Sequence, residues 1–170
     1  MEKQKYSSAE NFLKNTMGVL ALVFLVALLV FALAPDGLIR VLNGIGKVFG
    51  MEPARLVSEF PEQANFRYVP HRLWLVLSLS LMATITYISY LIWRNPRKHM
   101  ALVPVILLSK LASSLFALIY FFAQQRYFVN LAAFITDFPI FLIVLFAYIR
   151  VVLQKEKELV SQEKKPERNY

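Results

Sequence analysis

Four runs of apolar residues, each long enough to cross a bilayer as a helix, constrain this chain more than any other feature. They occupy residues 17–34, 73–93, 100–122 and 127–149. A helix rises about 1.5 Å per residue, so about 20 apolar residues cross the hydrocarbon core. The first run holds no charged residue over its 18 positions. We therefore expect an all-α membrane protein whose fold is a four-transmembrane-helix bundle.

The four runs together define one transmembrane domain over residues 17–153. A polar segment at 1–16 precedes it, and a charged tail at 154–170 follows it. The first run could also be a cleavable signal peptide, but the apolar core of such a peptide is normally about 7–15 residues long. In addition, Pro35 would stand just after the cleavage position. We therefore expect the first helix to remain in the protein.

Residues 38–50, in the loop after the first run, show a different helical pattern. Apolar residues recur there at spacings of three and four, whereas Arg40 and Lys47 fall between them. The segment is too short to span a bilayer, and its basic residues favour lipid headgroups. It predicts an amphipathic interfacial helix. We favour a cap over the end of the bundle; the alternative is a gate or a docking surface.

The composition supports this class and restricts the chemistry. The chain is 58% hydrophobic and 18% charged, with a net charge of +8. In a soluble protein that charge would suggest nucleic acid, but here the basic residues cluster beside the apolar runs, as they do next to anionic headgroups. We expect the lipid bilayer as a partner and no nucleic acid. The absence of cysteine excludes disulfides, thiolate metal sites and cysteine nucleophiles.

Basic residues are divided unevenly between the two sides of the predicted bundle. With four spans, both termini share a side with the basic loop at 94–99. That side carries twelve lysine and arginine residues outside the spans, and the other side carries six. Because positive loops are retained in the cytoplasm, we predict that both termini are cytoplasmic, in a plasma (inner) membrane.

Two charged residues interrupt the third and fourth runs. Lys110 falls about 15 Å along its helix, which is near the midplane. If the two runs form an antiparallel hairpin that turns at Gln124–Gln125, Asp137 lies within one turn of the same depth. An unpaired charge there costs about 2.5–3.5 kcal/mol or more. We therefore predict a buried ion pair between Lys110 and Asp137.

Other polar residues continue the helix faces that carry this pair. Helical spacing predicts that faces of the second, third and fourth runs converge on a polar interior, where hydroxyl groups share the hydrogen bonding of the pair. Pro139, two positions past Asp137, predicts a kink at the same level. The candidate intramembrane site comprises Lys110, Asp137, Ser113, Ser114, Asn130, Thr84 and Tyr87.

The pair allows two interpretations. In the first, which we favour, it is an internal clamp that fixes helix register, because buried ionic pairs often specify structure without reacting. In the second, Asp137 exchanges protons, or Lys110 holds an anionic headgroup or carboxylate during transport. Ionisable residues inside membranes commonly mark such paths.

Other catalytic or cofactor chemistry lacks the residues it needs. His71 and His99 lie at opposite ends of the second span and cannot share one metal or haem. The sequence has no glycine-rich phosphate loop, no G-x-S-x-G and no H-E-x-x-H. No second acid accompanies Asp137 in the spans. We expect no cofactor, no bound metal and no enzymatic activity.

These observations favour a non-enzymatic accessory or interaction subunit that binds another membrane protein or a second copy of itself. A small carrier or proton-coupled transporter that uses Lys110 and Asp137 directly is the alternative. A lipid-modifying enzyme would need a catalytic set that the sequence does not show.

Overall fold

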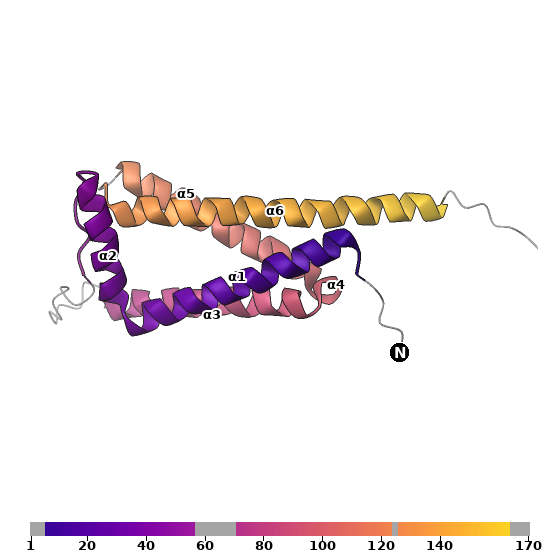
Figure 1. The fold of residues 1–170 in the computed structure, drawn as a ribbon, viewed down its shortest axis with the longest axis horizontal. Helices are drawn as coiled ribbons and strands as arrows, with labels where there is room; N and C mark the ends of the chain where they lie inside the picture. Colours follow the sequence, from indigo (N-terminus) through magenta and orange to yellow (C-terminus); the bar gives the residue numbers. More distant parts are fainter. Residues whose placement is uncertain (1–5, 57–70, 124–125, 164–170) are drawn as a thin grey trace, which may run out of the picture.

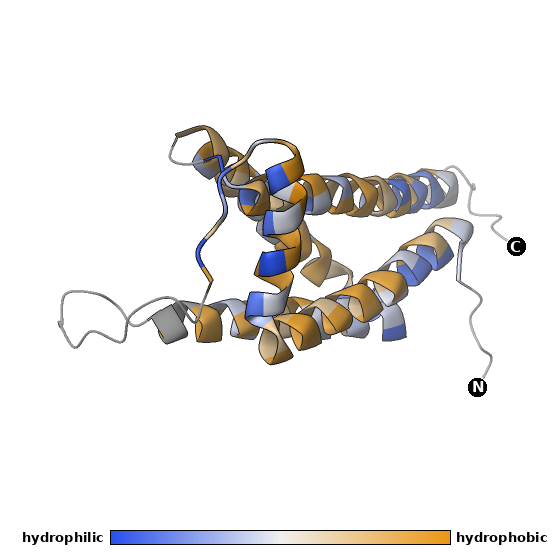
Figure 2. Ribbon diagram, turned by 60° about the vertical axis from the view of Figure 1, so that its left-hand side comes forward, coloured by the Kyte–Doolittle hydropathy of each residue, from blue (hydrophilic) through white to orange (hydrophobic). Residues whose placement is uncertain are grey.

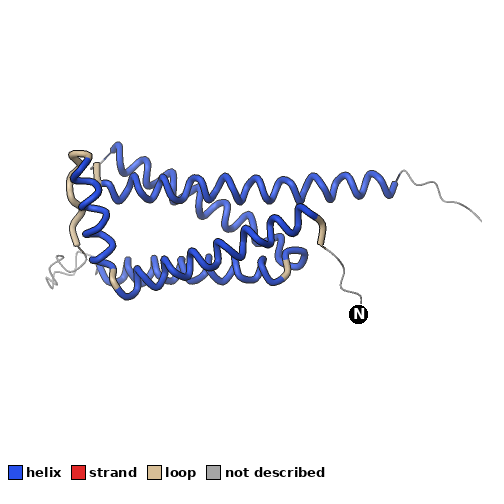
Figure 3. Tube along the Cα trace, viewed as in Figure 1, coloured by secondary structure: helices blue, strands red, loops and turns tan. Residues whose placement is uncertain are grey.

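The computed structural model describes residues 6–56, 71–123 and 126–163, and this part of the chain is helical apart from short connections (Figure 3). It contains no β-strand, only one isolated bridge between Glu52 and Tyr127. The prediction of an all-α fold is confirmed for these residues. The helices are α1 (Ser8–Leu33), α2 (Pro35–Val48), α3 (His71–Arg94), α4 (Pro96–His99), the 3-10 turn η2 (Met100–Leu102), α5 (Val103–Ala123) and α6 (Phe128–Glu163).

Four of the described helices are long and apolar enough to cross a membrane, as predicted. They cover Ser8–Leu33, Leu75–Arg94, Pro96–Ala123 and Phe128–Ser161. The largest differences from the predicted spans are in two helices: α1 begins within the segment expected to be solvated, and α6 continues into the charged tail. The predicted turn at Gln124–Gln125 and the last seven residues of the tail lie outside the described part of the chain.

The early start of α1 has a local cause. Ser7 accepts a hydrogen bond from the amide of Glu10, and the Glu10 carboxylate accepts one from the amide of Ser7. This capping box satisfies amide groups that have no partner within the helix. Glu10 also accepts two hydrogen bonds from Arg97 in α4, at 2.7 and 2.8 Å. We call this bidentate Glu10–Arg97 pair the clasp, since it joins the start of α1 to the α3–α5 connection.

The long helices pack as two pairs, α1 with α3 and α5 with α6, and α1 also contacts α6 (Figure 1). Helix α5 runs obliquely, from its start beside α4 to the end of the bundle where α2 lies (Figure 1). The buried core lies mainly between α1, the start of α5 and the second half of α6. It comprises Ala9, Leu13, Met17, Leu20, Phe24, Ile92, Val103, Ile106, Val144, Ala147 and Val151.

Most other apolar side chains face outward. Hydrophobic residues cover the long helices, while hydrophilic residues gather toward the chain ends and on the helix that lies across the bundle (Figure 2). Leu22 on α1 and Leu108 on α5 are 63% and 69% exposed. Such a surface suits hydrocarbon surroundings, in which outward apolar residues carry no penalty.

Helix α2 lies across the end of the bundle that is remote from the N-terminus (Figure 1). Pro35 ends α1 and opens α2 at the first helical position, where its missing amide hydrogen has no cost. The helix at 35–48 replaces the one predicted at about 38–50, and its location in the headgroup plane stays a prediction. It packs on α6, where the rings of Phe49 and Phe128 stack with centroids 6.1 Å apart.

The contact between α2 and α6 depends on Gly46. An added Cβ there would lie 2.6 Å from the Cβ of Phe128, closer than packed carbon atoms approach. At Gly44, on the same helix, an added Cβ would meet nothing within 4 Å. A methyl group therefore fits at Gly44 but not at Gly46, although both residues belong to α2.

We expect Gly46→Ala to lower the free energy of unfolding by about 1–3 kcal/mol, because the methyl group would push α2 away from α6. Gly44→Ala is the matched control and should leave stability unchanged or raise it by up to about 1 kcal/mol, since alanine favours helix. Thermal unfolding in detergent, followed by circular dichroism, measures both. Equal stabilities for the two variants would contradict the proposed close contact.

Candidate functional site

The two central charges meet in the α5–α6 hairpin. The ammonium nitrogen of Lys110 lies 2.7 Å from Oδ1 of Asp137. Lys110 is the eighth of the 21 residues of α5 and Asp137 the tenth of the 36 residues of α6, so the contact joins the first halves of the two helices. This arrangement follows from the antiparallel course of the two helices.

Two more side chains complete the site. The hydroxyl of Ser113, one turn from Lys110, donates a hydrogen bond to Oδ2 of Asp137, so both oxygens of that carboxylate are occupied. From the other side, the Lys110 ammonium lies 4.6 Å from the ring centroid of Phe24 on α1. A cation is attracted to the face of an aromatic ring. Three helices, α1, α5 and α6, therefore meet at this pair.

The prediction that the pair is buried is wrong. Within this chain the side chains of Lys110 and Asp137 keep 14% and 17% of their surface exposed. The cause lies in the helix arrangement: α3 packs on α1 and scarcely contacts α5, so that no fourth helix of the described structure covers the pair. The pair lies at the edge of the α5–α6 contact instead of inside a closed four-helix interior.

The structure does not bring the predicted residues of α3 to the pair. Thr84 is exposed, and its hydroxyl donates to the carbonyl of Ser80, four residues earlier in the same helix. Tyr87 is 61% exposed. The expected convergence of three polar faces fails because α3 turns this face away from α5 and α6.

Ser114 and Asn130 lie on α5 and α6 as predicted, but they take no part in the hydrogen bonds that join Lys110, Ser113 and Asp137. Ser114 is fully buried, and its hydroxyl donates to the carbonyl of Leu111 at 2.9 Å. Asn130 is partly buried near the start of α6, about 10 Å along the axis from Asp137. Of the seven candidates, Lys110, Ser113 and Asp137 form the site.

Sequence reasoning missed two polar features. The first is the clasp: the spacing of Ser7 and Glu10 indicates a capping box, but nothing indicates that Arg97 would bind the same carboxylate. The second is Ser89 on α3, which is fully buried and whose hydroxyl has no hydrogen-bond partner among the described residues. Its position on an otherwise apolar face gives no sequence signal.

The chain's relation to known proteins gives no further guidance. No protein-family model, no curated protein and no solved structure matches it. Within the described residues, no three His, Cys, Asp or Glu side chains lie close enough together to hold a metal ion. The interpretation of the site therefore depends on its own geometry.

The two adjacent serines of α5 allow a direct test of this geometry. Ser113→Ala removes a donor from the Asp137 carboxylate and should lower the free energy of unfolding by about 1–2 kcal/mol. Ser114→Ala removes a bond to a carbonyl of its own helix and should cost less than about 0.5 kcal/mol. Detergent unfolding curves for both variants provide the measurement. A larger loss for Ser114→Ala than for Ser113→Ala would refute the assignment of Ser113 to the site.

Proposed function

We propose that this chain spans the membrane four times and acts as a non-enzymatic accessory or interaction subunit, with the Lys110–Asp137 pair as a structural clamp. Four described helices that are long and apolar enough to cross a bilayer support the location in a membrane. The position of the pair, and the surface that the fold leaves uncovered, support the finer assignment.

The contacts of the pair support a clamp. Asp137 uses both carboxylate oxygens within the protein, and Lys110 contacts both Asp137 and the ring of Phe24. In hydrocarbon, apolar helix surfaces gain little by leaving lipid, so polar contacts and close packing carry the association. A pair that joins three helices at one depth fixes their register.

The outer face of α3 is the observation that carries the interaction role. Helix α3 packs along α1 on one side and has few contacts elsewhere in the described structure. Its uncovered face presents Ser80, Thr84 and Tyr87 at spacings of four and three residues, all of them exposed. Small hydroxyl residues are common where membrane helices pack against each other. We assign this face to a helix of a partner protein or of a second copy.

A small carrier is the second candidate, and the partial exposure of the pair favours it. Lys110 and Asp137 are not sealed by the fold, so a proton or an anionic group could reach them. Pro139 removes one backbone donor from α6 two positions beyond Asp137, which weakens the helix where such access would need it to move.

The proposed orientation keeps both termini in the cytoplasm of a plasma (inner) membrane. The start of α1 and the end of α6 lie toward the same end of the bundle, opposite α2 (Figure 1). This agrees with an even number of crossings, and the distribution of basic residues gives the direction.

Exchanging the two charges tests the clamp. Lys110→Asp and Asp137→Lys should each lower the free energy of unfolding by about 2 kcal/mol or more, since each leaves two like charges together. In the double variant the ions meet again, and most of the stability should return. A double variant as unstable as the sum of the single variants would refute the clamp.

The face on α3 can be tested by crosslinking, because the chain contains no cysteine of its own. We expect Thr84→Cys, treated in its native membrane with a short thiol crosslinker, to give one adduct of defined mass, either a homodimer or a complex with one partner. Leu108→Cys is the matched control: it is exposed on α5 at a similar depth and should give none. Equal crosslinking at both positions, or none at Thr84→Cys, would contradict the assignment.

A further inference from the structure

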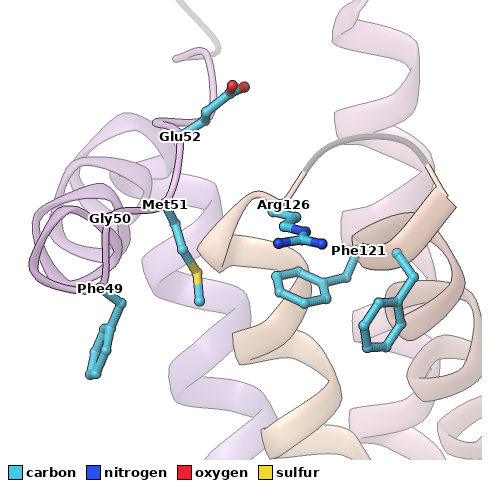
Figure 4. A pocket seen from close by; sticks show the side chains of 7 residues that line it. Phe49, Gly50, Met51, Glu52, Phe121 and Arg126 are labelled. Atoms are coloured by element: carbon cyan, nitrogen blue, oxygen red, sulfur yellow. The ribbon is translucent and has the colours of Figure 1, made fainter.

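An open groove of about 650 Å³ lies at the end of the bundle, where the chain leaves α2 and passes the junction of α5 with α6 (Figure 4). It lies remote from the Lys110–Asp137 pair and from the outer face of α3. Its lining residues are Phe49, Gly50, Met51, Glu52, Phe121, Phe122 and Arg126.

The wall formed by residues 49–52 is held in place by several backbone contacts. Gly50 has φ +67°, a conformation that favours glycine, and the amides of Gly50 and Met51 donate to the carbonyls of Lys47 and Gly46. The side chain of Asn43 exchanges two hydrogen bonds with the backbone of Ala54, at 2.7 and 2.9 Å. The groove is therefore preformed and does not depend on a ligand to shape it.

The groove combines apolar walls with one cation. In Figure 4 the guanidinium of Arg126 lies beside the ring of Phe121, and the carboxylate of Glu52 points away from it. Among the described residues, Arg126 forms no ion pair within 4 Å. A guanidinium that lies beside an aromatic wall, and that has no carboxylate partner in the described part of the chain, suits an anionic ligand that also has an apolar part.

The depth of the groove decides what that ligand is. Phe121 and Phe122 belong to the last turn of α5, at the end of its apolar run, and Arg126 comes just before α6 begins. If α5 and α6 cross the bilayer, the two phenylalanines lie in hydrocarbon and Arg126 lies at the level of the lipid phosphates.

We propose that this groove binds one anionic phospholipid, with its phosphate on the Arg126 guanidinium and an acyl chain along Phe121 and Phe122. The phosphodiester accepts paired hydrogen bonds from the planar guanidinium, and the chain fills the apolar part of the groove. This inference requires that α5 and α6 span the membrane, but it is independent of the clamp and of any protein partner.

Native mass spectrometry of the full chain in detergent, with phosphatidylglycerol or phosphatidylcholine added, tests the proposal. Both lipids have a phosphodiester, but the choline cation of phosphatidylcholine cancels the headgroup charge and repels Arg126. We therefore expect the wild type to retain one phosphatidylglycerol molecule and to retain phosphatidylcholine about tenfold less. Arg126→Gln should lose the preference, and Arg126→Lys should keep part of it. Arg40→Gln is the matched control, because Arg40 is exposed on α2 at the same end of the bundle.

Three results would overturn the proposal. They are unchanged phosphatidylglycerol retention in Arg126→Gln, an equal loss in Arg40→Gln, or displacement of the lipid by millimolar inorganic phosphate, which would indicate a site for the free ion. Circular dichroism of each variant establishes that it is folded. In a folded Phe122→Ala variant, weaker retention of both lipids supports the acyl-chain contact, and unchanged retention refutes it.

Discussion

The contact between Lys110 and Asp137 is the interaction on which the rest of the bundle depends. Lipid offers no hydrophobic gain for bringing helices together, so each pair of helices needs its own reason to associate. If α5 and α6 cross the bilayer, that reason is an ammonium and a carboxylate that would both be costly if left unpaired in hydrocarbon. Ser113 and Phe24 extend the contact, the latter to α1.

Two further attachments hold the bundle at its ends. The Glu10–Arg97 clasp joins α1 to the connection between α3 and α5, with the Glu10 side chain 8% exposed. At the other end, the close approach of Gly46 to Phe128 seats α2 against α6. The fold thus has polar or close contacts at three depths, which compensates for a buried core that is small for four long helices.

The parts of this fold that could be predicted are those that depend on one helix or on one turn. The four spans follow from run length, and the meeting of Lys110 with Asp137 follows from the symmetry of a hairpin about its turn. Ser113 belongs to the same face by helical spacing. The only neighbours that these inferences assume are two helices that are consecutive in the chain and joined by a short turn.

The parts that failed depend on helix neighbours. Whether α3 covers α5 or packs along α1 is decided by surface shape, such as the fit of Gly18 against Trp93, where an added Cβ would lie 2.7 Å from the indole ring. A single sequence does not encode that choice in any simple pattern. Because α3 packs on α1, Thr84 and Tyr87 lie away from the site and the central pair is partly exposed.

The length of α6 has a mechanical consequence. Its helix runs to Glu163, fourteen positions beyond residue 149, where the apolar run ends, which is about 20 Å of additional rise. If α6 crosses the bilayer, this extension, in which lysine and glutamate alternate over residues 155–158, projects into water beyond the lipid surface. Because a continuous helix moves as one body, a tilt of α6 about the central pair would displace Glu163 farther than any residue that lies closer to the pair.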